Sequence, residues 1–89
     1  MTEDQQMMQE IKEEMRLCRE EILKGEAMME ILEVLIEIKM AMGLDVALEK
    51  GKHDKISIAT AELKSVVAAA DSSMREFITA SALMENLVD

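Results

Sequence analysis

The chain has 89 residues, a length that allows one small domain. It has no proline, three glycines and a single aromatic residue, and 49% of its residues are apolar, a composition that favours helices and excludes a disordered acidic tail. Its formal net charge of −9 argues against binding to DNA or to an anionic membrane surface. One cysteine and one histidine exclude an internal disulfide and leave little for a zinc site.

No targeting or membrane-spanning segment is predicted. The first residues are acidic and lack the positive-then-apolar layout of a secretory signal peptide. No stretch approaches the roughly 18 uncharged apolar residues of a transmembrane helix. We therefore expect a soluble, cytoplasmic protein that forms one domain over residues 1–89.

The segment from Thr2 to Met42 carries an apolar repeat in alternating steps of four and three residues. In a heptad frame the a positions are Met8, Met15, Ile22, Met29 and Ile36, and the d positions are Ile11, Cys18, Gly25, Leu32 and Lys39. This spacing predicts one long helix, about 3–42, with one face against a partner helix. Gly25 indicates either a close approach of the partner backbone or a kink. Lys39 either specifies register or extends past the apolar face into solvent, and we favour the second interpretation.

A second apolar row runs along the C-terminal half of this helix. It consists of Met28, Ile31, Leu35, Ile38 and Met42. The polar residues of this half are confined to one face, chiefly Glu26, Glu30, Glu33 and Glu37. Because a helix that is apolar on most sides is usually buried, we expect residues 28–42 to contact two neighbours and residues 7–22 only one.

Residues 43–55 are predicted to connect this helix to the next. Gly43 is placed to end the first helix in a left-handed cap, and Asp45 is placed to cap a short helical turn that Gly51 ends. The only local positive cluster follows, in a predicted polar loop over 50–55: Lys50, Lys52, His53 and Lys55. It is either an ordinary soluble turn or a possible anion-binding site at the tip of a hairpin.

A second helix is predicted over about 57–88, with its own heptad frame. One set of contact positions is Ile56, Leu63, Ala70, Phe77 and Met84, and the other is Thr60, Val67, Met74, Ser81 and Val88. Its many alanines allow another helix to approach closely. A helix, a short connector and a second helix make an all-α antiparallel hairpin.

The two helices carry more apolar surface than a single hairpin can bury. Exposed apolar surface of this length is unusual on a monomer, and small chains commonly bury it by oligomerising. We therefore predict a homo-oligomer, a dimer or higher, that assembles as a helical bundle. The predicted oligomer or partner interface consists of Met28, Ile31, Leu32, Leu35, Ile36, Ile38, Val66, Val67, Met74, Phe77, Leu83 and Leu87.

No combination of residues predicts catalysis, a cofactor or a metal site. His53 has only its neighbour Asp54 beside it, which does not fix the geometry of a catalytic base. Cys18 lies on an apolar helix face among acidic residues, where a reactive thiol is not expected. There is no phosphate-binding glycine loop, and no histidine lies in either predicted helix. The chain is therefore predicted not to be an enzyme.

The sequence favours a non-enzymatic protein-interaction module: a small adaptor, chaperone or inhibitor that binds itself and another protein through apolar, Met-rich helix surfaces. One alternative is an oligomeric binder of a small or nucleic anion through the loop 50–55. Another is a structural bundle whose only partner is itself. The layout is similar in a general way to cochaperones of bacterial secretion and to phage assembly chaperones. That likeness covers the architecture and no sequence motif, so it assigns no role to any residue.

Overall fold

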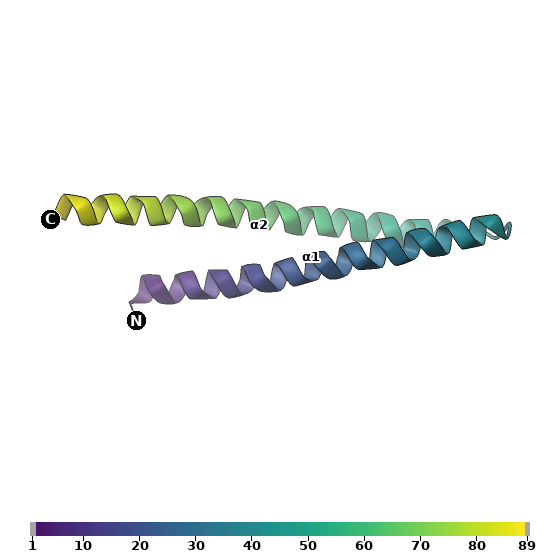
Figure 1. The fold of residues 1–89 in the computed structure, drawn as a ribbon, viewed down its shortest axis with the longest axis horizontal. Helices are drawn as coiled ribbons and strands as arrows, with labels where there is room; N and C mark the ends of the chain where they lie inside the picture. Colours follow the sequence, from purple (N-terminus) through teal and green to yellow (C-terminus); the bar gives the residue numbers. More distant parts are fainter. Residues whose placement is uncertain (1, 89) are drawn as a thin grey trace.

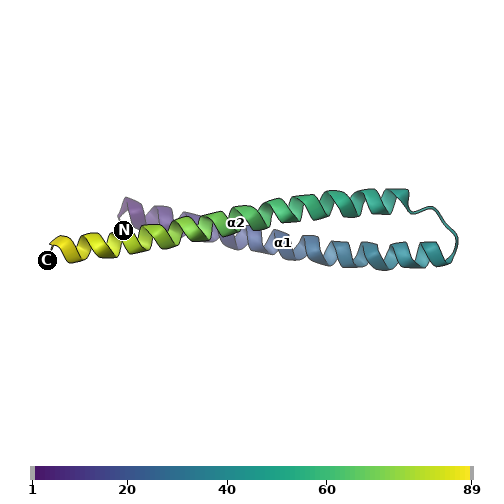
Figure 2. The same ribbon diagram turned by 90° about the horizontal axis from the view of Figure 1, so that it is seen from above.

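The computed structural model describes residues 2–88 as two long α-helices joined by a short connector (Figure 1). Helix α1 spans Glu3–Ala41 and helix α2 spans Ala47–Val88. They run antiparallel in a rod of 72 × 20 × 14 Å. Near the connector, the helices overlap in Figure 1 and lie apart in Figure 2. Toward the termini, they lie apart in Figure 1 and overlap in Figure 2. The helices therefore wind around each other as in a coiled coil. The predicted all-α antiparallel hairpin is confirmed, and its assembly into a bundle stays a prediction.

Hydrogen bonds at both ends of α1 explain its length. At the start, Thr2 Oγ1 accepts from Gln5 N–H at 3.2 Å and Gln5 Oε1 accepts from Thr2 N–H at 3.2 Å, which together form a capping box. At the end, Gly43 adopts a φ of 73°, the left-handed conformation that glycine tolerates best. Leu44 N–H then donates to Lys39 O at 2.8 Å, which completes a Schellman cap and confirms the predicted end at Gly43.

Helix α2 begins at Ala47, well before the predicted start near residue 57. Asp45 Oδ1 accepts the N–H of Ala47 at 3.2 Å and caps the first turn. Gly51 lies inside the helix and does not end it, so the predicted break there is wrong. The contact face of α2 continues backward from Ile56 through His53 and Glu49, and the polar character of these two residues concealed the helix in the sequence.

Most of the predicted heptad positions form the contact between the two helices. The exceptions are Ile11, Phe77 and Met84, which are exposed, and the side chain of Val88 lies outside the described part of the structure. The least exposed side chains of the rod recur in steps of three and four residues. In α1 they include Met8, Met15, Cys18, Ile22, Met29, Leu32, Ile36 and Lys39, and in α2 Glu49, His53, Ile56, Thr60, Leu63, Val67, Ala70, Met74 and Ser81. The core is thin, because Met15, Ile22 and Val46 are the only buried apolar residues in the part of the chain that the structure describes, and each keeps 6–9% of its surface exposed.

Helix α1 passes through Gly25 without a break. A Cβ atom built at Gly25 would lie 2.5 Å from Thr60 Oγ1 and 3.6 Å from Ile56 Cγ2. The first distance is shorter than any van der Waals contact, so only glycine lets α2 pack this closely. The predicted kink at Gly25 is therefore wrong, and the group that approaches closely is the buried side chain of Thr60, where partner backbone was predicted.

Candidate functional site

The hairpin exposes much more surface than a compact protein of the same mass. Its accessible surface is 7122 Å², whereas a compact chain of 10.0 kDa exposes about 5,200 Å². Its radius of gyration is 20.4 Å, against about 12 Å for a compact domain of this length. The excess of about 1,900 Å² is more than the roughly 800 Å² that each partner contributes to a stable protein–protein interface. The molecule therefore has room for a large contact with another chain.

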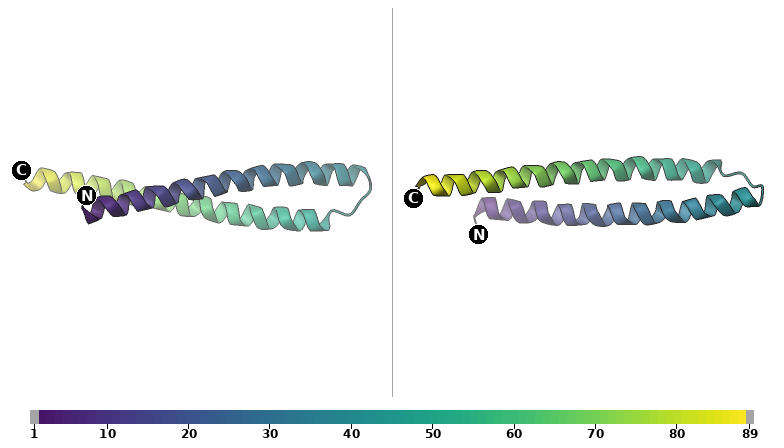
Figure 3. Two further views of the ribbon diagram at one scale, coloured as in Figure 1. Left: turned by 90° about the horizontal axis from the view of Figure 1, so that it is seen from below. Right: turned by 45° about the horizontal axis from the view of Figure 1, so that its top comes forward.

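Five apolar side chains of α1 form a continuous row that α2 does not cover. They are Met28, Ile31, Leu35, Ile38 and Met42, and their exposed fractions run from 36% to 68%. Steps of three and four residues place them one above another on one helix face, over a length of about 21 Å. We call this row the exposed strip. Figure 3 shows that no third element lies over either helix within residues 2–88.

The exposed strip meets the sequence-based expectation only in part. Residues 28–42 were expected to contact two neighbours, and the structure supplies one, the helix α2. Val34, next to Leu35, is also exposed and widens the apolar surface beside the strip. No second neighbour of this segment lies within residues 2–88.

The structure divides the predicted interface residues into two groups. One group is half-buried between α1 and α2 and belongs to the hairpin itself: Leu32, Ile36, Val67 and Met74. Phe77 lies on the same side of α2 but is 42% exposed. The other group is exposed: Met28, Ile31, Leu35 and Ile38 of α1, and Val66, Leu83 and Leu87 of α2. The last turns of α2 extend past the start of α1 (Figure 1), which explains why Leu83 and Leu87 have little cover.

The predicted basic loop over 50–55 does not exist, because these residues lie in the first turns of α2. Lys50 and Lys52 are two positions apart on a helix and therefore point in different directions. Lys52 and Lys55 border a hollow of about 380 Å³ beside the exposed strip, which Met28, Ile31, Leu32 and Ile56 also line. Lys50 and His53 border a different hollow of about 330 Å³, together with Glu33, Ile36, Glu37 and Asp54. The prediction of one positive cluster is thus wrong, since the helix divides it.

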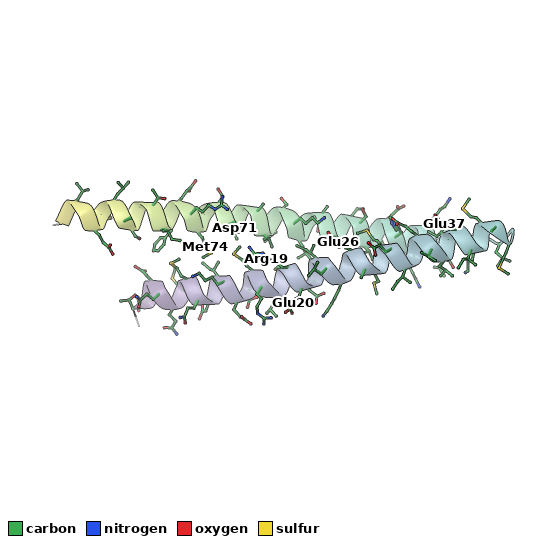
Figure 4. The ribbon with its side chains drawn as sticks, in the orientation of Figure 1. Arg19, Glu20, Glu26, Glu37, Asp71 and Met74 are labelled. Carbon is green, nitrogen blue, oxygen red and sulfur yellow. The ribbon has the colours of Figure 1, made fainter. Side chains whose placement is uncertain are left out.

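Two ion pairs and one histidine–carboxylate contact join one flank of α1 to α2. Arg19 Nη2 lies 3.3 Å from Asp71 Oδ2, and Lys64 Nζ lies 2.7 Å from Glu26 Oε1. His53 Nε2 lies 3.0 Å from Glu33 Oε1. Arg19 and Asp71 lie on the sides of the helices that face each other in Figure 4. Because these α1 residues are spaced by seven, the pairs line a single edge of the contact.

Lys39 forms a fourth pair, with Glu49, close to the connector. Glu49 is buried, and its hydrogen bond with Lys39 holds its pKa below the ordinary value; a hydrogen bond from its own backbone N–H adds to the effect. The interpretation that Lys39 extends past the apolar face into solvent is therefore wrong. The Lys39 ammonium group pairs with Glu49 within the contact between the helices. Glu49 lies in the segment that was predicted as connector.

An apolar hollow of about 330 Å³ lies near the free ends of the helices, and the sequence did not predict it. It is lined by Asp4, Met7, Met8, Ile11, Ala70, Ser73, Met74 and Phe77. The hollow forms because small residues, Ala70 and Ser73, alternate with bulky ones on α2. The heptad pattern of each helix was visible in the sequence, but the pairing of Met8 and Ile11 with this part of α2 was not. Such a hollow can receive an apolar side chain from another protein.

The described residues offer few groups for chemistry. Among residues 2–88, no cluster of three or more histidine, cysteine, aspartate or glutamate side chains is placed to hold a metal ion. Cys18 is a free, half-buried thiol in the contact between the helices. Neither helix has a described stretch that is long and apolar enough to cross a lipid bilayer. Comparison of the chain with protein-family models, curated proteins and solved structures yields no match.

Proposed function

We propose that the chain is a non-enzymatic protein-interaction module, a small homo-oligomeric helical hairpin that acts through its apolar, Met-rich helix surfaces. The exposed strip on α1 is the observation that carries this proposal. Fully burying one exposed side chain of this kind contributes about 1.5–3 kcal/mol, so covering these five partly exposed ones favours association. In an isolated hairpin this free energy is not realised.

The chemistry of these surfaces supports binding to a second kind of protein as well. Methionines stand at both ends of the exposed strip and in the hollow near the free ends. The flexible thioether side chain adapts to different partner shapes, a property of surfaces that accept more than one partner. Adaptors, small chaperones and inhibitors all act by occupying a partner surface in this way. The net charge of −9 keeps such a chain soluble while its apolar surface is free.

A matched pair of variants tests the proposal. Ile31→Glu places a charge in the exposed strip, and Ile58→Glu places the same charge at an isoleucine of similar exposure on α2, 62% against 68%. Sedimentation analysis measures self-association, and affinity capture from the native cell followed by mass spectrometry measures partner binding. We expect Ile31→Glu to lose both, and Ile58→Glu to keep both. A wild-type chain that is monomeric at micromolar concentration and captures no partner would contradict the proposal.

A further inference from the structure

We infer that a second copy of the chain covers the exposed strip, with α1 packed antiparallel on α1 of the other copy around a two-fold axis beside Leu35. This inference rests on the proposed function, because it names the occupant of the same surface. It commits to one geometry: the two hairpins overlap near their connectors, and their free ends point away from each other.

The order of residue types in the strip carries this inference. From either end the strip reads methionine, isoleucine, leucine, isoleucine, methionine, at positions 28, 31, 35, 38 and 42. The two methionines lie at equal sequence distances from Leu35, and the isoleucines lie four and three residues from it. A two-fold interface requires a surface patch that is complementary to itself. Antiparallel packing supplies this: Met28 lies against Met42 of the other copy, Ile31 against Ile38, and Leu35 against its own equivalent.

The area of the strip suits this occupant. Each exposed side chain of the strip, with Val34 beside it, presents on the order of 100 Å² of surface. Two copies therefore bring together about 1,200 Å², which is the lower end of the range for specific, stable interfaces. The strip also has the size and the straightness of one helix face, as antiparallel helix packing requires.

The charge of the chain predicts how this contact depends on salt. Each copy carries a net charge of −9. Two copies therefore repel each other at low ionic strength, and salt screens this repulsion. Self-association should strengthen as salt rises, whereas binding to a basic partner would weaken.

The geometry leaves the hollow near Met8 and Phe77 open in the dimer. Met8 and Met28 are separated by about 30 Å of helix, so the hollow lies well outside the proposed contact. A dimer of this form presents two such hollows at opposite ends of one long rod.

Disulfide cross-linking tests the geometry. In a Cys18→Ala background, we introduce Leu35→Cys, Met28→Cys or Met42→Cys one at a time and oxidise mildly. Leu35→Cys should form a covalent dimer of twice 10.0 kDa in high yield, because the axis brings the two thiols within disulfide reach. Met28→Cys alone should form almost none, since its two copies lie about 21 Å apart along the antiparallel helices, beyond disulfide reach. A mixture of Met28→Cys with Met42→Cys should form the mixed dimer.

The control is Ile58→Cys, a site outside the strip that is more exposed than Leu35 and should not cross-link. Equal cross-linking of Met28→Cys and Leu35→Cys would overturn the antiparallel arrangement. So would a wild-type dimer in which Leu35→Cys does not cross-link; the proposed homo-oligomer would survive that result. A monomeric wild type whose partner binding is abolished by Ile31→Glu would overturn the second copy as occupant and leave the interaction with another protein intact. Sedimentation of the wild type at increasing salt checks the inference without any substitution, and weakening self-association would contradict it.

Discussion

The two halves of the rod have the same heptad spacing but differ in the residues at the heptad positions and in how well these residues are buried. Near the connector, Ile22, Val46, Glu49 and Thr60 are buried and the pairs Lys39–Glu49, Glu33–His53 and Glu26–Lys64 join the helices. Toward the free ends, Met15 is the only buried side chain among the described residues, and an apolar hollow separates the helices beyond it. The quality of packing thus depends on which residues face each other across the contact. The heptad repeat of one helix does not predict this pairing.

This difference has a consequence for dynamics and for function. Regions with few buried contacts open at a lower free energy than the rest of a protein. The half with the free ends should therefore open first, while the half near the connector remains folded. The exposed strip lies on the tightly packed half, so it is a rigid surface, and the hollow lies on the looser, more adaptable half.

The largest difference in stability between the two halves should appear when one contact residue in each half is replaced by alanine. Ile22→Ala removes a buried side chain from the well-packed half and should lower the free energy of unfolding by about 2–4 kcal/mol. Met8→Ala, beside the hollow, should lower it by only about 1 kcal/mol, because the site is already incompletely packed. Urea unfolding at fixed protein concentration, followed by circular dichroism, measures both. Equal losses would show that the two halves are packed equally well.

A second, smaller effect tests the close approach at Gly25. Gly25→Ala places a Cβ 2.5 Å from Thr60 Oγ1, which should lower stability by about 1–2 kcal/mol once the better helix propensity of alanine is included. Gly51→Ala is the matched control, since nothing lies within 4 Å of a Cβ there, and it should raise stability by about 1 kcal/mol. The same urea experiment applies. Gly25→Ala should be partly rescued by Thr60→Ala, and the absence of any coupling between the two sites would contradict the contact.

The smallest effect concerns acid. The pKa of Glu49 is held below its ordinary value of about 4.3 by its hydrogen bond with Lys39, so the folded state binds this proton less readily than the unfolded state. The stabilisation is present above that ordinary pKa and is lost as the pH falls through the lower pKa of the folded state. The urea concentration at the unfolding midpoint should therefore decrease as the pH is lowered from neutral to about 3.

Two variants show where the acid dependence originates. Glu49→Gln should flatten it, because Glu49 joins α2 to α1. Glu13→Gln should change it less, although hydrogen bonding to Arg16 also lowers the pKa of Glu13, since that pair lies within α1 and is exposed. An unchanged acid dependence in Glu49→Gln would exclude the pair with Lys39 as its source.

The heptad pattern made most of the fold predictable. The contact face of α1 from Met8 to Lys39 could be predicted because apolar residues occupy nearly all of its positions. The start of α2 could not, because its first contact positions hold Glu49 and His53, whose partners Lys39 and Glu33 lie on the other helix. Polar pairs of this kind look like loop in a single sequence and become part of a contact only when both helices are in place.

The candidate site could likewise be predicted only where it depends on the pattern of one helix and not on the pairing of two. The exposed strip was visible as a second apolar row, and the structure adds that α2 leaves it uncovered. The basic cluster was predicted in error because it depended on a loop, and a helix separates Lys50 and His53 from Lys52 and Lys55. The hollow near the free ends depends on the size of residues that face each other, such as Met8 and Phe77, and on the register that brings them together.

The charges on the paired flank reverse sign between the heptad of Arg19 and the next one, that of Glu26. Arg19 is positive where Glu26 is negative, and their partners Asp71 and Lys64 carry the opposite signs. If α2 slid by one heptad in one direction, Arg19 would face Lys64, and in the other direction Glu26 would face Asp71. Either displacement exchanges attraction for repulsion between like charges. This reversal of sign thus favours the observed alignment of the helices while the hairpin folds. In that register, every charge of this flank meets its opposite.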